Sequence, residues 1–370
     1  MSISDDQDAM LRAARKKARQ AIRTAFTQAR SYLKGVEDAS EYDIEWLSKI
    51  RPKFMTQGSY AYKTLNAPCY KSQEIDLDDG VYLPMSIMNT APEANKDWFF
   101  AIVDGALREL AEKENWEFSN EKNTCARIII PGKQAHIDIP LYAVPDSRHA
   151  HMVEAIGDLN VKLGELLFER DGPELKTFLL DENEIYLATR DEGWRKSDPL
   201  LIANWFKQQI GIKGQRLRRI CCFLKAWRDY CWEAGGPSSL ALMICAAEAY
   251  PLDDRGRDDY ALLEVVKTLP TRLSGKIYNP ACKYPEVVYP RGNSDQAEIV
   301  ACSNQMLNAL QSAVSGSLDK AAVVDACITQ FGRRLPCRPE WIDVITSAEI
   351  VRSTPAVSVK PERIPNARSG

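Results

Sequence analysis

Residues 56–85 read TQGSYAYKTLNAPCYKSQEIDLDDGVYLPM, and the fold is decided in this stretch. Its first part predicts a strand that ends at Gly58-Ser59 and passes into a short helix; its last part alternates apolar and polar residues and predicts a second strand. Residues two apart in a strand point to the same face, so Asp76 and Asp78 project together. Such a pair is either solvated at a strand end or bridged by a cation. Hard divalent cations such as magnesium take oxygen ligands of this kind.

Two further features favour the cation. Gly58 allows close approach of the backbone, while the hydroxyl of Ser59 and the helix amides can hold a phosphate, although an ordinary helix cap would look the same. Asp138 lies in the otherwise apolar segment HIDIP, where a lone carboxylate costs several kcal/mol unless something pairs with it. A metal shared with the earlier two aspartates would be that partner. His136 shares the face of Asp138, and we expect it to pack or hydrogen-bond rather than to act in catalysis.

The organisation of the chain follows outward from this stretch. Residues 8–33 predict one long helix laid across the body with its charged face in water, because apolar residues recur every three or four positions. Residues 54–142 have the texture of an α/β region, and the chain beyond about Asp198 reads as helical to near its end. From Ser353 onward the prolines, serines and scattered charges predict a disordered tail.

Composition excludes several classes of protein. The 370 residues carry 48 Lys+Arg and 51 Asp+Glu, and a net charge of −3 argues against a protein that coats DNA or RNA. No stretch approaches the ~18 consecutive apolar residues of a membrane span. Ten cysteines are too few for a disulfide scaffold, and none stands at zinc-ligand spacing from the three histidines. The polar, acidic start does not resemble a secretory signal, so we expect a cytoplasmic protein.

The order of the motifs resembles one known family. Gly-Ser, Asp-x-Asp and a third Asp on a later strand are similar to polymerase-β-type nucleotidyltransferases, and residues 56–85 look like the bacterial cGAS/DncV-like members, closest to the DncV-like branch. The strings NTCARI, HIDIPLYAVP, SDP and KAWRDYCWEAGGPSSLALM follow in the family's order, and the resemblance covers roughly residues 40–250. It implies α/β plus α architecture: a polymerase-β-like core with a mixed sheet, a helical C-terminal lobe and a bridging N-terminal helix. The implied divisions are 1–39, 40–195, 196–350 and a tail over 351–370.

The resemblance also implies an activity. Such enzymes join nucleoside triphosphates, here ATP and GTP, into a cyclic dinucleotide of the cGAMP type for antiphage defence. Asp76, Asp78 and Asp138 would hold two Mg²⁺ ions, for which Mn²⁺ substitutes, and pyrophosphate would leave. The alternatives are another cyclic di- or trinucleotide, a linear oligonucleotide, a non-nucleotide acceptor such as an antibiotic, or a catalytically silent nucleotide-binding regulator.

The nucleotide-binding set implied by the resemblance has eight members: Gln57, Gly58, Ser59, Tyr62, Arg127, Ser197, Lys225 and Ser239. The first three would grip phosphate, and Lys225 with Ser239 would hold the triphosphate from the helical lobe. Tyr62 is expected to stack on a base, with core packing as the alternative. Arg127 would donate to guanine O6 and N7, or else serve as a charge partner of the acidic cluster. Ser197 would lie near the base.

Partners are implied less directly. The animal DNA-sensing relatives have a zinc insertion and basic surfaces, which this chain lacks, so we expect neither a DNA activator nor a membrane. A downstream effector would read the cyclic product. The end Asn-Ala-Arg-Ser-Gly is similar to C-termini conjugated by ubiquitin-like machinery, which would act at Gly370; an ordinary frayed end or a cloning boundary is the alternative.

Overall fold

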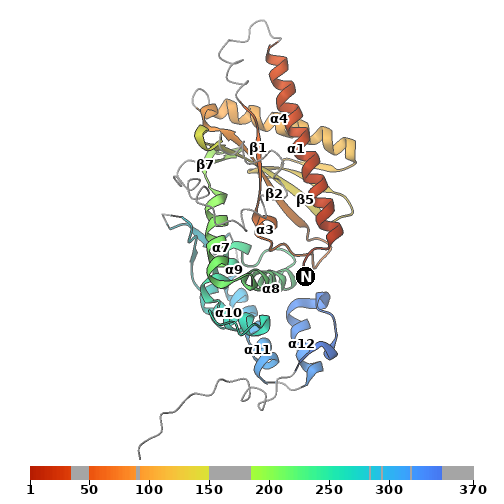
Figure 1. The fold of residues 1–370 in the computed structure, drawn as a ribbon, viewed down its shortest axis with the longest axis vertical. Coiled ribbons are helices and arrows are strands. Elements are labelled where there is room, and N and C mark those ends of the chain that lie inside the picture. The colour runs from red at the N-terminus through yellow and green to blue at the C-terminus, as the bar shows by residue number, and fades with distance from the viewer. Residues whose placement is uncertain are drawn as a thin grey trace, which may run out of the picture.

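The structure, a computed structural model, describes residues 1–34, 50–88, 92–149, 185–282, 285–292, 295–316 and 319–343. The C-terminal tail and Gly370 lie outside these residues. A mixed sheet with helices forms one end of an elongated molecule, and a helical region forms the other (Figure 1). The architecture is therefore the expected α/β plus α. The four-part division of the chain stays a prediction.

Seven strands form the main sheet: β1 (Lys53–Gln57), β2 (Ile75–Pro84), β3 (Glu117–Ser119), β4 (Cys125–Ile130), β5 (Ala135–Val144), β6 (Tyr186–Thr189) and β7 (Gly193–Lys196). Their order is β1-β2-β5-β4-β3, with β6 paired to β5 and β7 to β6. β2 and β5 run parallel, and the remaining pairs of this sheet are antiparallel. The two central strands thus start at the same edge of the sheet, where their first residues lie side by side.

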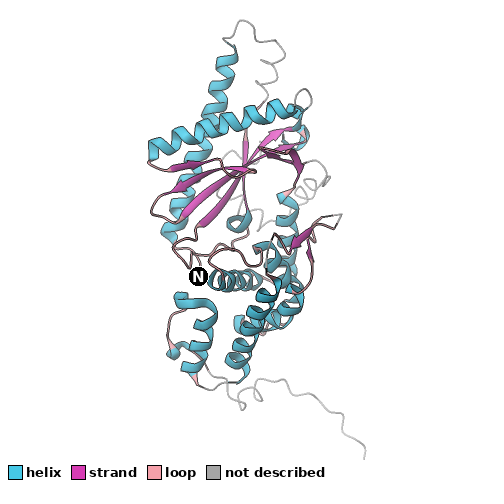
Figure 2. Ribbon diagram, turned by 180° about the vertical axis from the view of Figure 1, so that it is seen from behind, coloured by secondary structure: helices cyan, strands magenta, loops and turns pink. Residues whose placement is uncertain are grey.

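One face of the sheet is covered by α1 (Asp5–Lys34) and α4 (Pro92–Glu114), which cross each other (Figures 1 and 2). Phe26 of α1 packs on Trp98 and Phe99 of α4, with ring centroids 6.3 and 5.8 Å apart. Fully buried side chains such as Phe26 and Phe99 each contribute about 1.5–3 kcal/mol, and Trp98 is partly buried. The long N-terminal helix is confirmed as an element that binds the sheet.

The charged face of α1 corrects one expectation, because part of it is buried rather than in water. Arg19 is 6% exposed and donates to both carboxylate oxygens of Asp79 on β2. Arg15 donates to the hydroxyl of Thr56 at 2.7 Å. A buried guanidinium needs such a bidentate partner, since an unpaired charge there would be strongly destabilising. The basic run between residues 12 and 23 therefore fixes α1 to the sheet.

The other helices and short elements are α3 (Gly58–Ala61), η1 (Met85–Met88), α7 (Pro199–Lys213), α8 (Arg216–Cys231), α9 (Ser239–Ala249), α10 (Asp258–Leu273), α11 (Gln296–Gln311), η3 (Ser312–Gly316), α12 (Lys320–Phe331), η4 (Gly332–Arg334) and η5 (Pro339–Trp341). The helical region also holds a hairpin of β8 (Ile277–Tyr278) and β9 (Val287–Tyr289), which the sequence did not predict. Trp227 of α8 lies at the centre of the helical core and is fully buried. In the described part of the chain, no helix is long and apolar enough to cross a membrane.

Candidate active site

Strand register brings the predicted acids together. Asp78 on β2 stands directly beside Asp138 on β5, and Asp76 stands beside His136. Alternation along β2 points Asp76 and Asp78 away from α1, whereas the next residue, Asp79, points toward α1 and Arg19. We call Asp76, Asp78, Asp138 and His136 the acid cluster. It lies on the sheet face opposite α1 and α4.

Asp138 is the most strongly held member of the acid cluster. Arg127 of β4 donates to both of its oxygens, at 2.6 and 2.9 Å, and Lys122 donates to Oδ2 at 2.7 Å. Burial alone would raise the pKa of Asp138, but the hydrogen bonds from Arg127 and Lys122 lower it below its ordinary value. The carboxylate therefore stays ionised. Sequence reasoning missed Lys122, a loop lysine without a motif.

Asp78 differs from Asp138 in that its surroundings disfavour the ionised form. Burial, together with the charges of Asp76 and Asp138, raises its pKa to about 7. Gly58 lies against it: a Cβ on Gly58 would come 2.2 Å from the Asp78 Oδ2, and the backbone there has φ +61°. Only glycine fits such a position without strain. Gly58 thus lets the turn after β1 pass next to the acid cluster.

His136 connects the acid cluster to the residue before β2. Its Nδ1 lies 2.6 Å from Oε2 of Glu74, and its Nε2 lies 3.0 Å from Oδ1 of Asp76. Burial lowers the pKa of His136, but Asp76 outweighs this and the net shift is upward. Ligand atoms of Asp76, His136 and Asp138 lie within 4.8 Å of one another, which fits a divalent cation.

The phosphate-binding prediction joins residues from the two regions. Lys225 of α8 donates to the hydroxyl of Ser59 at 2.9 Å and to the carbonyl oxygen of Thr64 at 2.6 Å. We call these three residues the lysine junction. Burial, first, and Arg228 nearby lower the pKa of Lys225 to about 8, and Lys225 is only 6% exposed. Among the residues that the structure describes, the lysine ammonium has no acidic hydrogen-bond partner.

Ser239, the second residue predicted on the helical side, is held by Arg228. Arg228 Nη1 donates to its hydroxyl at 2.9 Å, and Nε and Nη2 donate to Asp229. The cap of α9 is Ser238, whose hydroxyl accepts from the amide of Ala241. The hydroxyl of Ser239 is thereby available for a role other than capping. Arg228 lies within the string KAWRDYCWEAGGPSSLALM that carries the family resemblance, but the sequence analysis assigned it no role.

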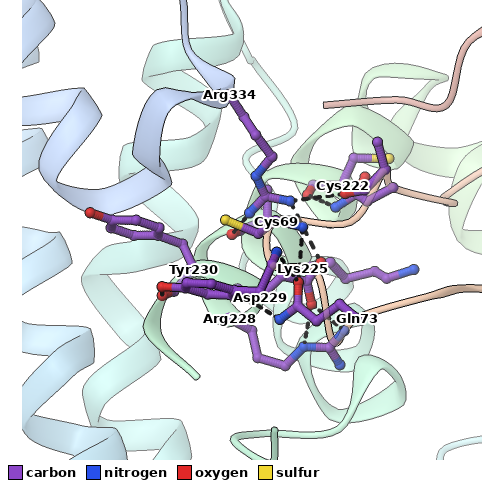
Figure 3. A network of polar contacts seen from close by, with 12 residues as sticks. Cys69, Gln73, Cys222, Lys225, Arg228, Asp229, Tyr230 and Arg334 are labelled. Atoms are coloured by element: carbon purple, nitrogen blue, oxygen red, sulfur yellow. Dashed lines mark hydrogen bonds and ion pairs between the residues drawn. The ribbon is translucent and has the colours of Figure 1, made fainter. Parts of the chain in front are cut away.

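A polar network fixes the loop between α3 and β2 to the end of α8 (Figure 3). The side-chain amide of Gln73 donates to the carbonyl oxygen of Asp229 at 2.7 Å. The hydroxyl of Tyr70 donates to the backbone carbonyl oxygen of Tyr230, also at 2.7 Å. Arg334 of η4 donates to the carbonyl oxygens of Ala67, at 3.2 Å, and Ala226. Arg334 therefore contacts both the loop and the residue that follows Lys225.

Three predicted residues are placed differently from the acid cluster and the lysine junction. Gln57 turns its amide to the hydroxyls of Tyr82 and Tyr142, at 2.5 and 3.1 Å, so a phosphate contact there would fall to its backbone. Tyr62 packs edge-on against Phe206 with centroids 5.8 Å apart, which is the packing alternative. Ser197 precedes Asp198, the cap of α7. Arg127 contacts Asp138, and its contact with a base stays a prediction.

A cavity of about 420 Å³ lies between α1, β1, α3 and the start of α7. Gln57 and Tyr62 line it, and the three aspartates of the acid cluster do not. Its positively charged lining consists of Arg12, Arg15, Arg19, Lys63 and Lys207, and Asp5 and Asp8 also line it. The cavity is thus a separate, mainly basic site behind the strand that carries Gln57.

Comparison with known proteins adds to this geometry. Residues 52–142 match the family model of the DncV-like nucleotidyltransferase domain of cyclic GMP-AMP synthase, and residues 214–343 match that of the synthase C-terminal domain. A cyclic GMP-AMP synthase of Escherichia coli (strain TW11681) is 32% identical over 335 residues, which cover 86% of this chain and 74% of that protein. A cyclic GMP-AMP synthase of Vibrio cholerae is 32% identical over 330 residues, covering 85% and 74%.

Solved structures agree. Vibrio cholerae DncV cyclic AMP-GMP synthase, in complex with the linear intermediate 5′ pppA(3′,5′)pG, superposes with a TM-score of 0.77 at 26% identity and 94% coverage of both chains. The same Vibrio protein in complex with GTP and 5MTHFGLU2 superposes with a TM-score of 0.75 at 27% identity, covering 93% of this chain and 94% of that one. The likeness extends over both the sheet and the helical region.

Proposed function

The chain belongs to the family of DncV-like nucleotidyltransferases, and from that premise we propose that it joins ATP and GTP into a cyclic GMP-AMP dinucleotide. In each of two steps a ribose hydroxyl oxygen bonds to the α-phosphorus of a triphosphate. The bond from that phosphorus to the bridging oxygen breaks, pyrophosphate leaves, and the hydroxyl gives up its proton. The second step closes the ring.

The acid cluster supplies the ligands for the proposed reaction. Asp76, Asp78 and Asp138 would hold two Mg²⁺ ions, which supply charge neutralisation and a lowered hydroxyl pKa when bound. Arg127 and Lys122 keep Asp138 ionised and fixed, which suits a ligand better than a proton acceptor. Such positioning and charge stabilisation is most of what phosphoryl transfer needs.

The lysine junction would hold the donor triphosphate. Lys225 is a compact charge that a phosphate oxygen can contact in place of the Thr64 carbonyl, while Ser59 and the amides at the start of α3 reach the same phosphates. Ser239 would add a hydroxyl donor from α9. Arg127 and Ser197 remain the candidates for contact with the guanine base, and Tyr62 for stacking.

The observation that carries the proposal is the register of Asp78 beside Asp138 on two parallel strands, one short turn away from the Ser59–Lys225 contact. This arrangement supports the proposal, because the turn at Gly58-Ser59 contacts both Asp78 of the sheet and Lys225 of the helical region.

Product analysis tests the proposal. The purified protein is incubated with the four labelled nucleoside triphosphates and Mg²⁺, and the product is treated with phosphatase and identified by mass spectrometry. We expect a phosphatase-resistant product with the mass of cyclic GMP-AMP, absent from the Asp76→Ala/Asp78→Ala variant. Nuclease P1 then reports 3′–5′ bonds. A different mass selects another cyclic or linear oligonucleotide, and nucleotide binding without pyrophosphate release selects the silent regulator.

In the cell, we propose that the product acts as a second messenger in antiphage defence and is read by a downstream effector. Duplex DNA is not expected to activate synthesis, which the same assay tests by adding it. Conjugation of Gly370 by ubiquitin-like machinery stays a prediction; mass spectrometry of the C-terminal peptide from cells challenged with phage would detect it.

We further propose that the basic cavity behind β1 binds a small polyanion. Its five cationic residues outnumber the two acids Asp5 and Asp8, which favours carboxylate groups, and a related Vibrio structure contains the folate-derived ligand 5MTHFGLU2 together with GTP. Thermal shift titrations with folates of increasing glutamate number should show growing stabilisation, reduced in Lys63→Met/Lys207→Met. Lys267→Met on α10, an exposed lysine paired with Glu264, is the matched control. Absence of a shift at every glutamate length would exclude this ligand class.

A further inference from the structure

His136 presents a buried ring nitrogen to the acid cluster. The residue is 6% exposed, yet in the described part of the chain neither its Nε2 nor Oδ1 of Asp76 has a hydrogen-bond partner. The two atoms lie 3.0 Å apart and pair with each other only when His136 is protonated; in the neutral ring whose Nδ1 carries the proton, two acceptors face each other. Buried polar atoms of this kind are costly unless something else satisfies them.

The spacing of the donor atoms fits one shared ion. With bonds of about 2.1 Å, adjacent ligands of an octahedral ion stand about 3.0 Å apart and opposite ones about 4.2 Å. His136 Nε2 is 3.0 Å from Asp76 Oδ1 and 4.0 Å from Asp138 Oδ1. Those distances match an adjacent pair and a nearly opposite pair.

Glu74 completes the pattern on the far side of the imidazole. Its Oε2 lies 2.6 Å from Nδ1 of His136, so that nitrogen can donate to the carboxylate and direct Nε2 at the acid cluster. A carboxylate behind a metal-bound histidine fixes the ring and raises its basicity as a ligand. A histidine that merely packed against the sheet would need no such anchor.

We propose that His136 is a nitrogen ligand of the metal site, oriented by Glu74, and that it shifts the site's preference toward Mn²⁺ over Mg²⁺. Imidazole suits transition-metal ions, whereas Mg²⁺ prefers oxygen donors. The inference rests on the proposed function only in placing a metal at the acid cluster. It adds a ligand to that site and a selectivity that three carboxylates would not give.

Pulsed EPR of the Mn²⁺-loaded full-length protein tests this directly, without turnover. We expect modulation from a coordinated ¹⁴N, which changes on labelling the histidines with ¹⁵N and is absent from His136→Gln. The matched control is His149→Gln, because His149 Nε2 donates to the carbonyl oxygen of Arg51 at 3.0 Å, away from the acid cluster. The nitrogen signal should persist in that variant.

Metal titrations give a second readout. His136→Gln should weaken Mn²⁺ binding about 10-fold and Mg²⁺ binding about 2-fold. Glu74→Gln should weaken Mn²⁺ binding several-fold, and because Glu74 is partly exposed this substitution leaves the core intact. Mn²⁺ bound without nitrogen coupling, or with coupling unchanged in His136→Gln, overturns the inference alone. Failure of the wild-type protein to bind either ion overturns the metal site and the proposed function with it.

Discussion

The acid cluster and the lysine junction are built on opposite principles. In the acid cluster three carboxylates converge, and the pKa of Asp78 is raised to about 7 because its neighbours repel its charge. In the lysine junction Lys225 is buried among neutral acceptors, and its pKa is lowered to about 8. The acid cluster and the lysine junction, the two halves of the site, therefore each hold a charged group whose ionised form is disfavoured by its surroundings. Metal ions and a triphosphate are the charges that each half lacks, so ligand binding relieves both.

The largest expected effect comes from the acid cluster. Asp138→Asn should reduce product formation by at least about 10²–10³-fold, the loss typical of removing one group that stabilises transition-state charge. Asp79→Asn serves as the contrast, since Asp79 faces Arg19 on the other side of the strand and its loss should lower the thermal midpoint. A variant Asp138→Asn with near-normal turnover would show that the acid cluster is not the reaction centre.

Lys225→Met should weaken triphosphate binding by roughly 10–100-fold, which corresponds to one charge-assisted hydrogen bond of about 1.5–3 kcal/mol. Metal binding at the acid cluster should stay unchanged. Isothermal titration with a non-hydrolysable GTP analogue, and with Mn²⁺ separately, measures the two halves independently. Equal losses in both titrations would mean that the halves do not act as separate binding elements.

The pH dependence of triphosphate binding should report Lys225. Its ammonium loses its proton as the pH rises through about 8, so affinity should fall above that pH and binding should take up a proton there. Without ligand, the unfolded chain holds this proton up to the ordinary lysine pKa of 10.5, so this lysine makes the fold more stable as the pH rises from 8 to 10.5. Calorimetry in buffers of different ionisation enthalpy detects the proton, and Lys225→Met should abolish its uptake.

A smaller effect is expected from Arg334, which acts on the lysine junction through the backbone of α8. Arg334→Met should raise the KM for triphosphate about 3–10-fold, corresponding to one or two ordinary hydrogen bonds, and should leave Mn²⁺ binding unchanged. Arg338→Met is the matched control, because Arg338 is exposed and pairs with Glu340. In a Lys225→Met background the Arg334 substitution should have little further effect on KM.

The smallest effect concerns the charge repulsion in the acid cluster. Between pH 4 and 7 the folded, metal-free protein holds a proton on Asp78 that the unfolded chain releases, so this group lowers stability as the pH rises. Asp78→Asn in EDTA at pH 8 should therefore raise the thermal midpoint by about 2–4 °C. Saturating Mn²⁺ should remove the advantage. A lower midpoint in EDTA would contradict the repulsion.

The sequence predicted the parts that follow from local rules. Strand alternation sufficed to pair Asp76 with Asp78, and the cost of a lone buried carboxylate identified Asp138. Lys225 came from the family resemblance, since nothing local distinguishes it from other helical lysines. Lys122 and Arg334 were missed because a loop and a contact between residues 67 and 334 carry no periodic signal. Gln57 belongs to the predicted motif, but its side chain contacts Tyr82 and Tyr142; the motif does not specify the direction of this side chain.

The contact between Ser59 and Lys225 joins residues 166 positions apart in the chain. During synthesis on a ribosome, strands β1 to β5 emerge before α8, so a nascent chain can bring its acids together before Lys225 is available to contact a triphosphate. Arg334 leaves the ribosome later still. Under the proposed function, a translation product interrupted before Lys225 carries the acids without this contact to the triphosphate, so we expect its synthesis of the signalling nucleotide to be impaired.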